Sequence, residues 1–157
     1  MKYLKLFENF NPDEIRSNIK DILLDIEDKG IYTSVYLDVW KKATMLNEAT
    51  ILISNIDLEN ISSSSMNPFT IDNDFFTTLE HLNSYLDSED YRLSTISFRA
   101  KDHDGLIQND GCDDLDELKR LIEVWNYDSF ESIKLKYKSK KYRSKVVFEH
   151  SEFWFNN

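Results

Sequence analysis

Histidine and cysteine side chains, from which many metal and nucleophile sites are built, are scarce in this sequence. The 157 residues include three histidines, His81, His103 and His150, and one cysteine, Cys112. A structural zinc site needs four nitrogen or sulfur ligands, usually in closely spaced pairs, and the sequence contains no such pair. We therefore expect no metal site and no metal cofactor, and a single cysteine excludes an intramolecular disulfide.

The densest group of candidate metal ligands is Asp102-His103-Asp104-Gly105. It opens an acidic stretch, residues 102–117, that has seven carboxylates and no lysine or arginine. Carboxylates at this spacing can begin a calcium loop, but that loop needs a third oxygen ligand where Leu106 stands, and a glutamate at a fixed distance. We expect a solvated acidic turn that holds no metal tightly; weak binding of a divalent ion is the alternative.

Nucleophilic catalysis has no recognisable motif in the chain. No Gly-x-Ser-x-Gly sequence is present, and three glycines are too few for a phosphate-binding loop. Cys112 lies among acidic residues, which raise the pKa of a thiol and so lower its reactivity. The sequence therefore predicts a protein without enzymatic activity, with no catalytic residue and no cofactor-binding residue.

Charge is distributed unevenly along the chain. Nineteen lysines and arginines against 29 acids give a formal net charge of −10, and a field of that sign repels nucleic acid on average. Residues 134–145 are an exception and carry positive charge, because they include seven basic residues and no acid. We predict a binding surface made of Lys134, Lys136, Lys138, Lys140, Lys141, Arg143 and Lys145.

Every second residue from Lys134 to Lys140 is a lysine, so on a β-strand the four lysines share one face. The apolar residues between them, such as Leu135 and Tyr137, face the other way and anchor the strand to the core. Three interpretations remain open. The lysines protect an edge strand from aggregation, or they lie against the acidic stretch of the same molecule, or they meet the phosphates or carboxylates of an anionic partner.

Tyr32, Tyr36 and Trp40 form a second candidate binding surface. Residues 31–40 alternate between apolar and polar positions, and these three aromatic residues fall on the polar side. Aromatic side chains on the open face of a sheet stack on bases in single-strand-binding domains. The alternative is that a helix or C-terminal aromatic residues cover this face.

Local patterns predict the elements that must position these residues. Capping signals and periodic apolar residues predict helices over 12–29, 72–87 and 114–125. Alternation predicts strands over 31–40, 49–56 and 91–100, and a C-terminal hairpin in which 131–139 pairs with 143–150. The serine-rich stretch 57–68 predicts an internal flexible loop, and residues 101–113 predict an acidic loop.

These elements predict a single domain, residues 1–157, of the α+β class. We expect two layers, in which three helices pack on a mainly antiparallel sheet. Residues 2–7 are either a short helix or a further strand. With that strand, the first hundred residues follow the β-α-β-β-α-β order of the ferredoxin-like fold, with α-β-β appended. No run of 18 apolar residues occurs, so we expect no membrane span.

The opening sequence MKYLKLFE, residues 1–8, is similar to the start of many small uncharacterised proteins encoded by large tailed bacteriophages. The low alanine and glycine content also resembles that of proteins from AT-rich phage genomes. In some such phages, comparable N-terminal peptides direct internal proteins into the prohead and are trimmed after a Leu-x-Glu sequence, which Leu6-Phe7-Glu8 matches. The resemblance implies a location in the host cytoplasm or inside the virion. The alternative is that these residues pack on the core.

Taken with the segregated charge, these features favour a non-enzymatic acidic interaction protein, encoded by a phage, that binds a host or phage macromolecule. Such a protein acts as an inhibitor or imitates nucleic acid towards a basic protein partner. The alternative is a nucleic-acid or nucleotide binder that uses the basic residues 134–145.

Overall fold

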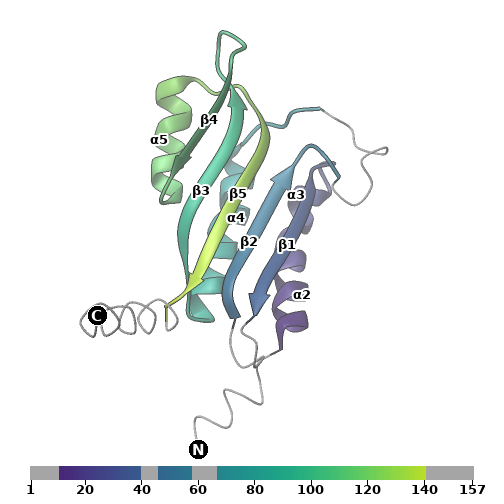
Figure 1. The fold of residues 1–157 in the computed structure, drawn as a ribbon. Coiled ribbons are helices and arrows are strands. Elements are labelled where there is room, and N and C mark those ends of the chain that lie inside the picture. The colour runs from purple at the N-terminus through teal and green to yellow at the C-terminus, as the bar shows by residue number, and fades with distance from the viewer. Residues whose placement is uncertain (1–10, 40–45, 58–66, 141–157) are drawn as a thin grey trace, which may run out of the picture.

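The computed structural model describes residues 11–39, 46–57 and 67–140, and its five strands form one antiparallel sheet in the order β1-β2-β5-β3-β4 (Figure 1). The strands are β1 (Tyr32–Val39), β2 (Leu46–Ser54), β3 (Tyr91–Lys101), β4 (Ile107–Cys112) and β5 (Ser129–Ser139). The helices are α2 (Pro12–Ile22), α3 (Leu24–Glu27), α4 (Asn73–Ser88) and α5 (Leu115–Trp125). The predicted two-layer α+β class is confirmed.

The helix boundaries follow the capping signals in the sequence. The Asn11 side chain accepts hydrogen bonds from the first turn of α2, the nearer at 3.0 Å, and satisfies donors that have no partner within the helix. The predicted helix 12–29 is interrupted at Leu23, continues as α3, and is followed by Gly30 at a φ of +83°. Asp72 and Asp114 cap α4 and α5 in the same way, each accepting a backbone hydrogen bond at 2.8 Å.

The described helices pack on one face of the sheet, and the core lies between the two layers (Figure 1). Strand β5 contributes Ile133, Leu135 and Tyr137, whose side chains are fully buried. The prediction that these residues anchor the lysine-rich strand to the core is confirmed. Leu82 of α4 and Leu118 of α5 are buried from the helical side.

An aromatic cluster occupies the part of the core near the start of β5. The Phe130 ring centroid lies 6.2 Å from that of Phe69, 5.6 Å from that of Phe98 and 6.1 Å from that of Tyr127. Phe69 precedes α4 and forms an isolated backbone bridge with Phe130. The cluster therefore joins the segment before α4 to two neighbouring strands of the sheet.

The central position of β5 overturns the predicted connections of the sheet. In a ferredoxin-like order, the strand between β2 and β3 comes from the beginning of the chain. Here residues 129–139 occupy that position, so the predicted ferredoxin-like order is wrong. Residues 2–7, expected to form a short helix or a further strand, lie outside the described residues, as do residues 143–150, expected to form the second strand of a hairpin.

The predicted loop over 101–113 is wrong in its second half, because Ile107–Cys112 is strand β4, paired with β3. The sequence IQNDGC has no clear alternation of apolar and polar residues. A tight turn between β3 and β4 reverses the direction of the chain. In this turn Gly105 has a φ of +81°, and the Asp102 side chain accepts hydrogen bonds from the backbone of Asp104 and Leu106 at 2.9 and 3.0 Å. The turn, rather than the strand's own propensity, places β4 beside β3.

All the described elements contribute to one hydrophobic core, and a single domain over residues 1–157 stays a prediction. Within the described ranges, no helix has the length and apolar character needed to cross a membrane. Most of the predicted flexible loop, 57–68, lies outside these ranges.

Candidate binding face of the sheet

The sheet face opposite the described helices carries parts of both predicted binding surfaces (Figure 1). Tyr36 of β1 is opposite Thr50 of β2, which is in turn opposite Lys136 of β5. Neighbouring strands are about 4.8 Å apart, so Tyr36 and Lys136 are about 10 Å apart across the sheet. We call this surface the open face; it includes Tyr32, Ser34, Tyr36, Asp38, Glu48, Thr50, Leu52, Arg92, Thr95, Ser97, Arg99, Lys134, Lys136 and Lys138.

The three lysines of β5 follow the middle of the open face at intervals of about 7 Å. Lys134 and Lys138 are exposed, and among the described residues neither forms an ion pair. The Lys136 ammonium lies 3.6 Å from the Glu48 carboxylate. Lys140 differs from the prediction, because it follows the end of β5 and pairs with Asp87 of α4 at 2.6 Å. Three lysines rather than four therefore share the open face.

Two of the three interpretations of these lysines are wrong. β5 is a central strand, so its lysines do not protect an edge. The ion pairs of the described lysines of this segment lead to Glu48 and Asp87 rather than to the acidic stretch 102–117. Contact with an anionic partner stays a prediction.

The two described aromatic residues of the second surface lie on β1. Tyr36 is 52% exposed and Tyr32 is half-buried. They are four residues apart on one strand, which separates their Cα atoms by about 13 Å. The appended helix α5 packs against α4 and β4 instead of covering the open face. Trp40, Lys141, Arg143 and Lys145 lie outside the described residues.

Arg92 and Arg99 of β3 also belong to the open face, and sequence reasoning missed them. Arg92 is opposite Lys138, and the Arg99 guanidinium pairs with the Glu131 carboxylate at 2.6 Å. The two arginines are seven residues apart, so strict alternation would put them on opposite faces, and the irregularity in β3 between Leu93 and Thr95 brings both onto one face. The sequence does not show that β3 lies beside β5. Only in this strand order do the two arginines lie next to the lysines of β5.

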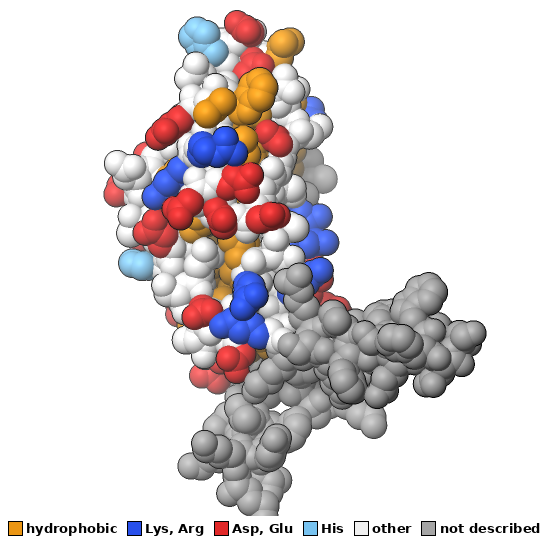
Figure 2. Space-filling model, turned by 90° about the vertical axis from the view of Figure 1, so that its left-hand side faces the viewer, with side chains coloured by type: hydrophobic (Ala, Val, Ile, Leu, Met, Phe, Trp, Pro, Cys, Tyr) orange, Lys and Arg blue, Asp and Glu red, His pale blue; other side chains and the backbone are white. Residues whose placement is uncertain are grey.

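The layer of helices on the other face of the sheet is acidic, whereas the open face carries lysines and arginines. The segment 67–90, which contains α4, has six acids and no lysine or arginine. Figure 2 shows acidic side chains gathered on the side of the molecule where α5 lies. The two layers are separated by about 10 Å, close to the Debye length of about 8 Å at physiological salt. The open face and the helical layer can therefore present separate fields to a partner.

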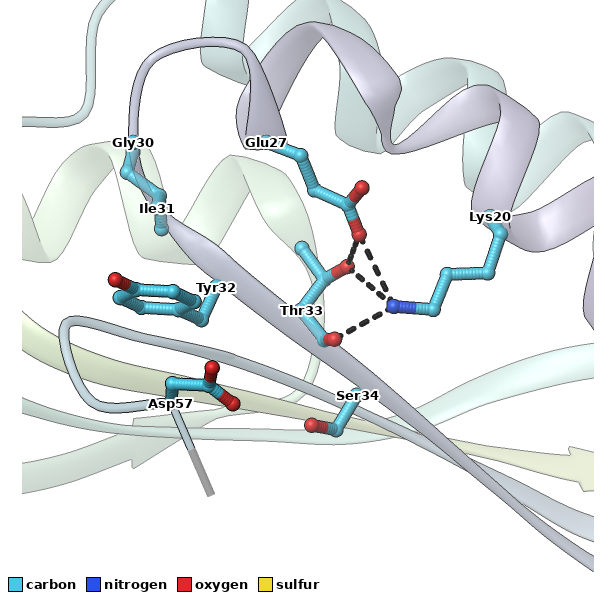
Figure 3. A pocket seen from close by; sticks show the side chains of 8 residues that line it. All are labelled: Lys20, Glu27, Gly30, Ile31, Tyr32, Thr33, Ser34 and Asp57. Carbon is cyan, nitrogen blue, oxygen red and sulfur yellow. Dashed lines mark hydrogen bonds and ion pairs between the residues drawn. The ribbon is translucent and has the colours of Figure 1, made fainter. Parts of the chain in front are cut away.

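A pocket of about 340 Å³ lies at the start of β1, where the open face meets the helical layer (Figure 3). On the helical side, the Lys20 ammonium donates to Glu27 at 3.0 Å, to the Thr33 carbonyl at 2.6 Å and to the Thr33 hydroxyl at 3.0 Å. The Thr33 hydroxyl donates to Glu27. Tyr32, Ser34 and Asp57 lie on the other side of the strand. Lys20 thus covers part of the outer edge of β1, which protects an edge strand from pairing with other chains.

Several carboxylates of the acidic stretch have structural roles in the described part of the chain. Asp102 closes the turn before β4, Asp114 caps α5, and Asp110 accepts a hydrogen bond from the Tyr127 hydroxyl at 3.2 Å. Among the described residues, no three histidine, cysteine, aspartate or glutamate side chains form a group that could hold a metal ion. The absence of a tightly bound metal stays a prediction.

Cys112 is expected to resist thiol reagents while the protein is folded. Its side chain is buried, and burial, followed by the nearby Glu117 and Asp114 carboxylates, raises its pKa to about 12. At pH 8, about one molecule in ten thousand then carries the reactive thiolate. A disulfide reagent should label the native protein very slowly at pH 8 and label one thiol per chain in denaturant. Cys112→Ser supplies the blank, and fast labelling of the native protein would show that the thiol is accessible.

No protein-family model, no curated protein sequence and no solved structure matches this chain. The resemblance of its first residues to phage proteins and the absence of enzymatic activity therefore stay predictions.

Proposed function

We propose that the open face binds single-stranded nucleic acid. The observation that carries this proposal is the position of β5, which places Lys134, Lys136 and Lys138 in the middle of a face that has Tyr32 and Tyr36 at its β1 side. Lysines at this spacing can neutralise successive phosphates, and exposed aromatic rings can stack on bases.

The arrangement favours a single strand over a duplex. In a duplex the faces of the bases are hidden by stacking, whereas a single strand can turn its bases onto the rings of Tyr32 and Tyr36. Each stacked base contributes about 1–3 kcal/mol to the binding free energy in proteins of this kind. The open face also carries hydroxyl groups on β2 and β3, the two strands that pair with β5, including those of Thr50, Thr95 and Ser97. These hydroxyls can donate hydrogen bonds to phosphate or sugar oxygens.

The overall acidity of the chain sets a limit on affinity. A net charge of −10 repels a polyanion at long range, while the open face attracts it at short range. We therefore expect moderate affinity that falls steeply as salt increases.

Replacing Lys134, Lys136 and Lys138 by glutamine is expected to weaken the binding of labelled oligonucleotides of about 12 nucleotides, measured by fluorescence anisotropy at ~50 mM salt. Loss of three phosphate contacts should also reduce the slope of log affinity against log salt by about 2. The melting temperature should change little, because surface ion pairs such as Lys136–Glu48 contribute about 0–1 kcal/mol.

A matched control removes the same charge from the helical layer. Arg16→Gln, Lys29→Gln and Arg120→Gln also subtract three positive charges from exposed positions, but outside the open face. This variant should retain nearly the wild-type affinity and salt slope. Equal losses in both variants would indicate a general charge effect, and no binding by the wild type at ~50 mM salt would contradict the proposal.

The second candidate is an interaction protein that uses its acidic helical layer to bind a basic protein partner, as a phage-encoded inhibitor or nucleic-acid mimic. The observation that favours it is the absence of lysine and arginine from residues 67–90, which contain six acids. If the wild type binds no oligonucleotide but retains one stoichiometric, salt-sensitive protein from a host lysate, and Asp74→Asn with Glu80→Gln loses that protein, this candidate replaces the first.

A further inference from the structure

The three lysines of β5 on the open face, which we call the lysine row, have unlike strands on their two sides (Figure 1). On one side, β3 has two arginines, one lysine and no acid, and Arg92 lies directly opposite Lys138. On the other side, β2 has one acid, Glu48, and no lysine or arginine. An anion that binds the lysine row is therefore attracted towards β3 and repelled from β2.

Glu48 lies beside the lysine row. Its backbone is opposite Lys138 in the pairing of β2 with β5, and its carboxylate lies 3.6 Å from the ammonium group of Lys136. Both side chains of this ion pair are partly exposed, Glu48 by 30% and Lys136 by 40%. In contrast, no ion pair involves Lys134 or Lys138 within the described ranges. The central lysine of the row is therefore bound to an anion of the protein itself, at a position that solvent reaches.

Resting on the proposed function, we infer that Glu48 competes with the nucleic-acid backbone for Lys136 and so sets the affinity of the open face. A carboxylate and a phosphate accept the same charge-assisted hydrogen bonds from an ammonium group. A strand whose phosphates follow the lysine row must therefore displace Glu48 from Lys136 before it can use all three lysines. Lys134 and Lys138 bind phosphates without this competition.

The same carboxylate orients the bound strand. Glu48 lies on β2, between the lysine row and β1, and repels phosphates from that side within a Debye length of about 8 Å. The backbone is thereby directed over β5 and β3, where Thr95 and Ser97 have hydroxyl groups. The bases then extend over β2 towards Tyr36, whose ring is 52% exposed.

Glu48→Gln is expected to strengthen the binding of a 12-residue oligothymidylate by about 3- to 10-fold, measured by fluorescence anisotropy at ~50 mM salt. The amide carries no charge to hold the Lys136 ammonium, so one more phosphate contact forms without competition. The slope of log affinity against log salt should become steeper by about 0.7, the value for one phosphate of a single strand.

Glu117→Gln is the matched control. The Glu117 carboxylate of α5 lies 3.7 Å from the Arg120 guanidinium, so the change removes the same charge from an ion pair of similar length. Because α5 packs against α4 and β4, this ion pair lies outside the open face. We expect an affinity within about 2-fold of the wild type and an unchanged salt slope. Circular dichroism checks that both variants fold.

Lys136→Gln tests whether the gain depends on this lysine. Adding Glu48→Gln to Lys136→Gln should change the affinity by less than about 2-fold, because the ammonium group for which the two anions compete is absent. A gain of the same size with and without Lys136 would overturn the competition and indicate general repulsion by Glu48.

The outcomes separate this inference from the proposed function. If the wild type and Glu48→Gln bind the oligonucleotide equally, competition by Glu48 is overturned and binding by the open face stands. The same holds if Glu117→Gln gains as much affinity as Glu48→Gln. Failure of both the wild type and Glu48→Gln to bind overturns the proposed function and this inference together.

Discussion

Phe130→Ala is expected to lower the free energy of unfolding by about 3–5 kcal/mol, the largest effect of any single change considered for this protein. Phe130 is 1% exposed and its ring meets those of Phe69, Phe98 and Tyr127. Removing it leaves a cavity that β3, β5 and the segment before α4 can fill only by moving closer together. Equilibrium unfolding in urea, followed by circular dichroism and by fluorescence, measures the change.

Tyr36→Ala provides the contrast, because it removes an aromatic ring that is 52% exposed from the same sheet. This change should cost less than about 1 kcal/mol. Similar losses of stability in the two variants would contradict the position of Phe130 in the core. Retention of the Phe130→Ala variant at wild-type stability would contradict the aromatic cluster itself.

The second large effect is expected at alkaline pH. Burial raises the pKa of Tyr137, and burial together with the Asp110 carboxylate raises the pKa of Tyr127 to about 12. In the unfolded chain both phenols titrate near pH 10. Above pH 10 the unfolded state therefore releases protons that the folded state retains, and the free energy of unfolding falls as pH rises towards 12. Below pH 10 this contribution to stability is fully present.

Unfolding curves in urea at about pH 8, 9, 10 and 11 should show this decline, and the absorbance of tyrosinate should follow it. Tyr127→Phe should make the decline shallower, at a cost of about 0.5–1.5 kcal/mol at pH 8 for the lost hydrogen bond to Asp110. Tyr36→Phe, at a side chain that is 52% exposed, is the matched tyrosine-to-phenylalanine control. A profile that stays flat to pH 11 in the wild type would contradict the burial of these two phenols.

Local sequence signals predicted most of the individual elements. Asn11 followed by Pro12, and Gly30 at the other end, marked a helical segment because capping and left-handed backbone conformations depend on neighbouring residues alone. The alternation that predicted a strand over 31–40 succeeded for the same reason, since each side chain's face depends only on its position along the strand. It also predicted correctly that Leu135 and Tyr137 face the core.

The open face depends on contacts between distant parts of the chain. A strand with a lysine at every second residue has the same sequence pattern at the edge of a sheet as at its centre. Nothing in the local sequence therefore showed that β5 is the central strand. The strand β4 was missed because IQNDGC has weak β-propensity and is held in place by its turn and by β3. Composition and periodicity alone thus determined the α+β class, the capped helices and the faces of the strands. Only the tertiary structure brought Tyr36, Lys136 and Arg92 onto one surface, because strand order is decided by packing of the whole core.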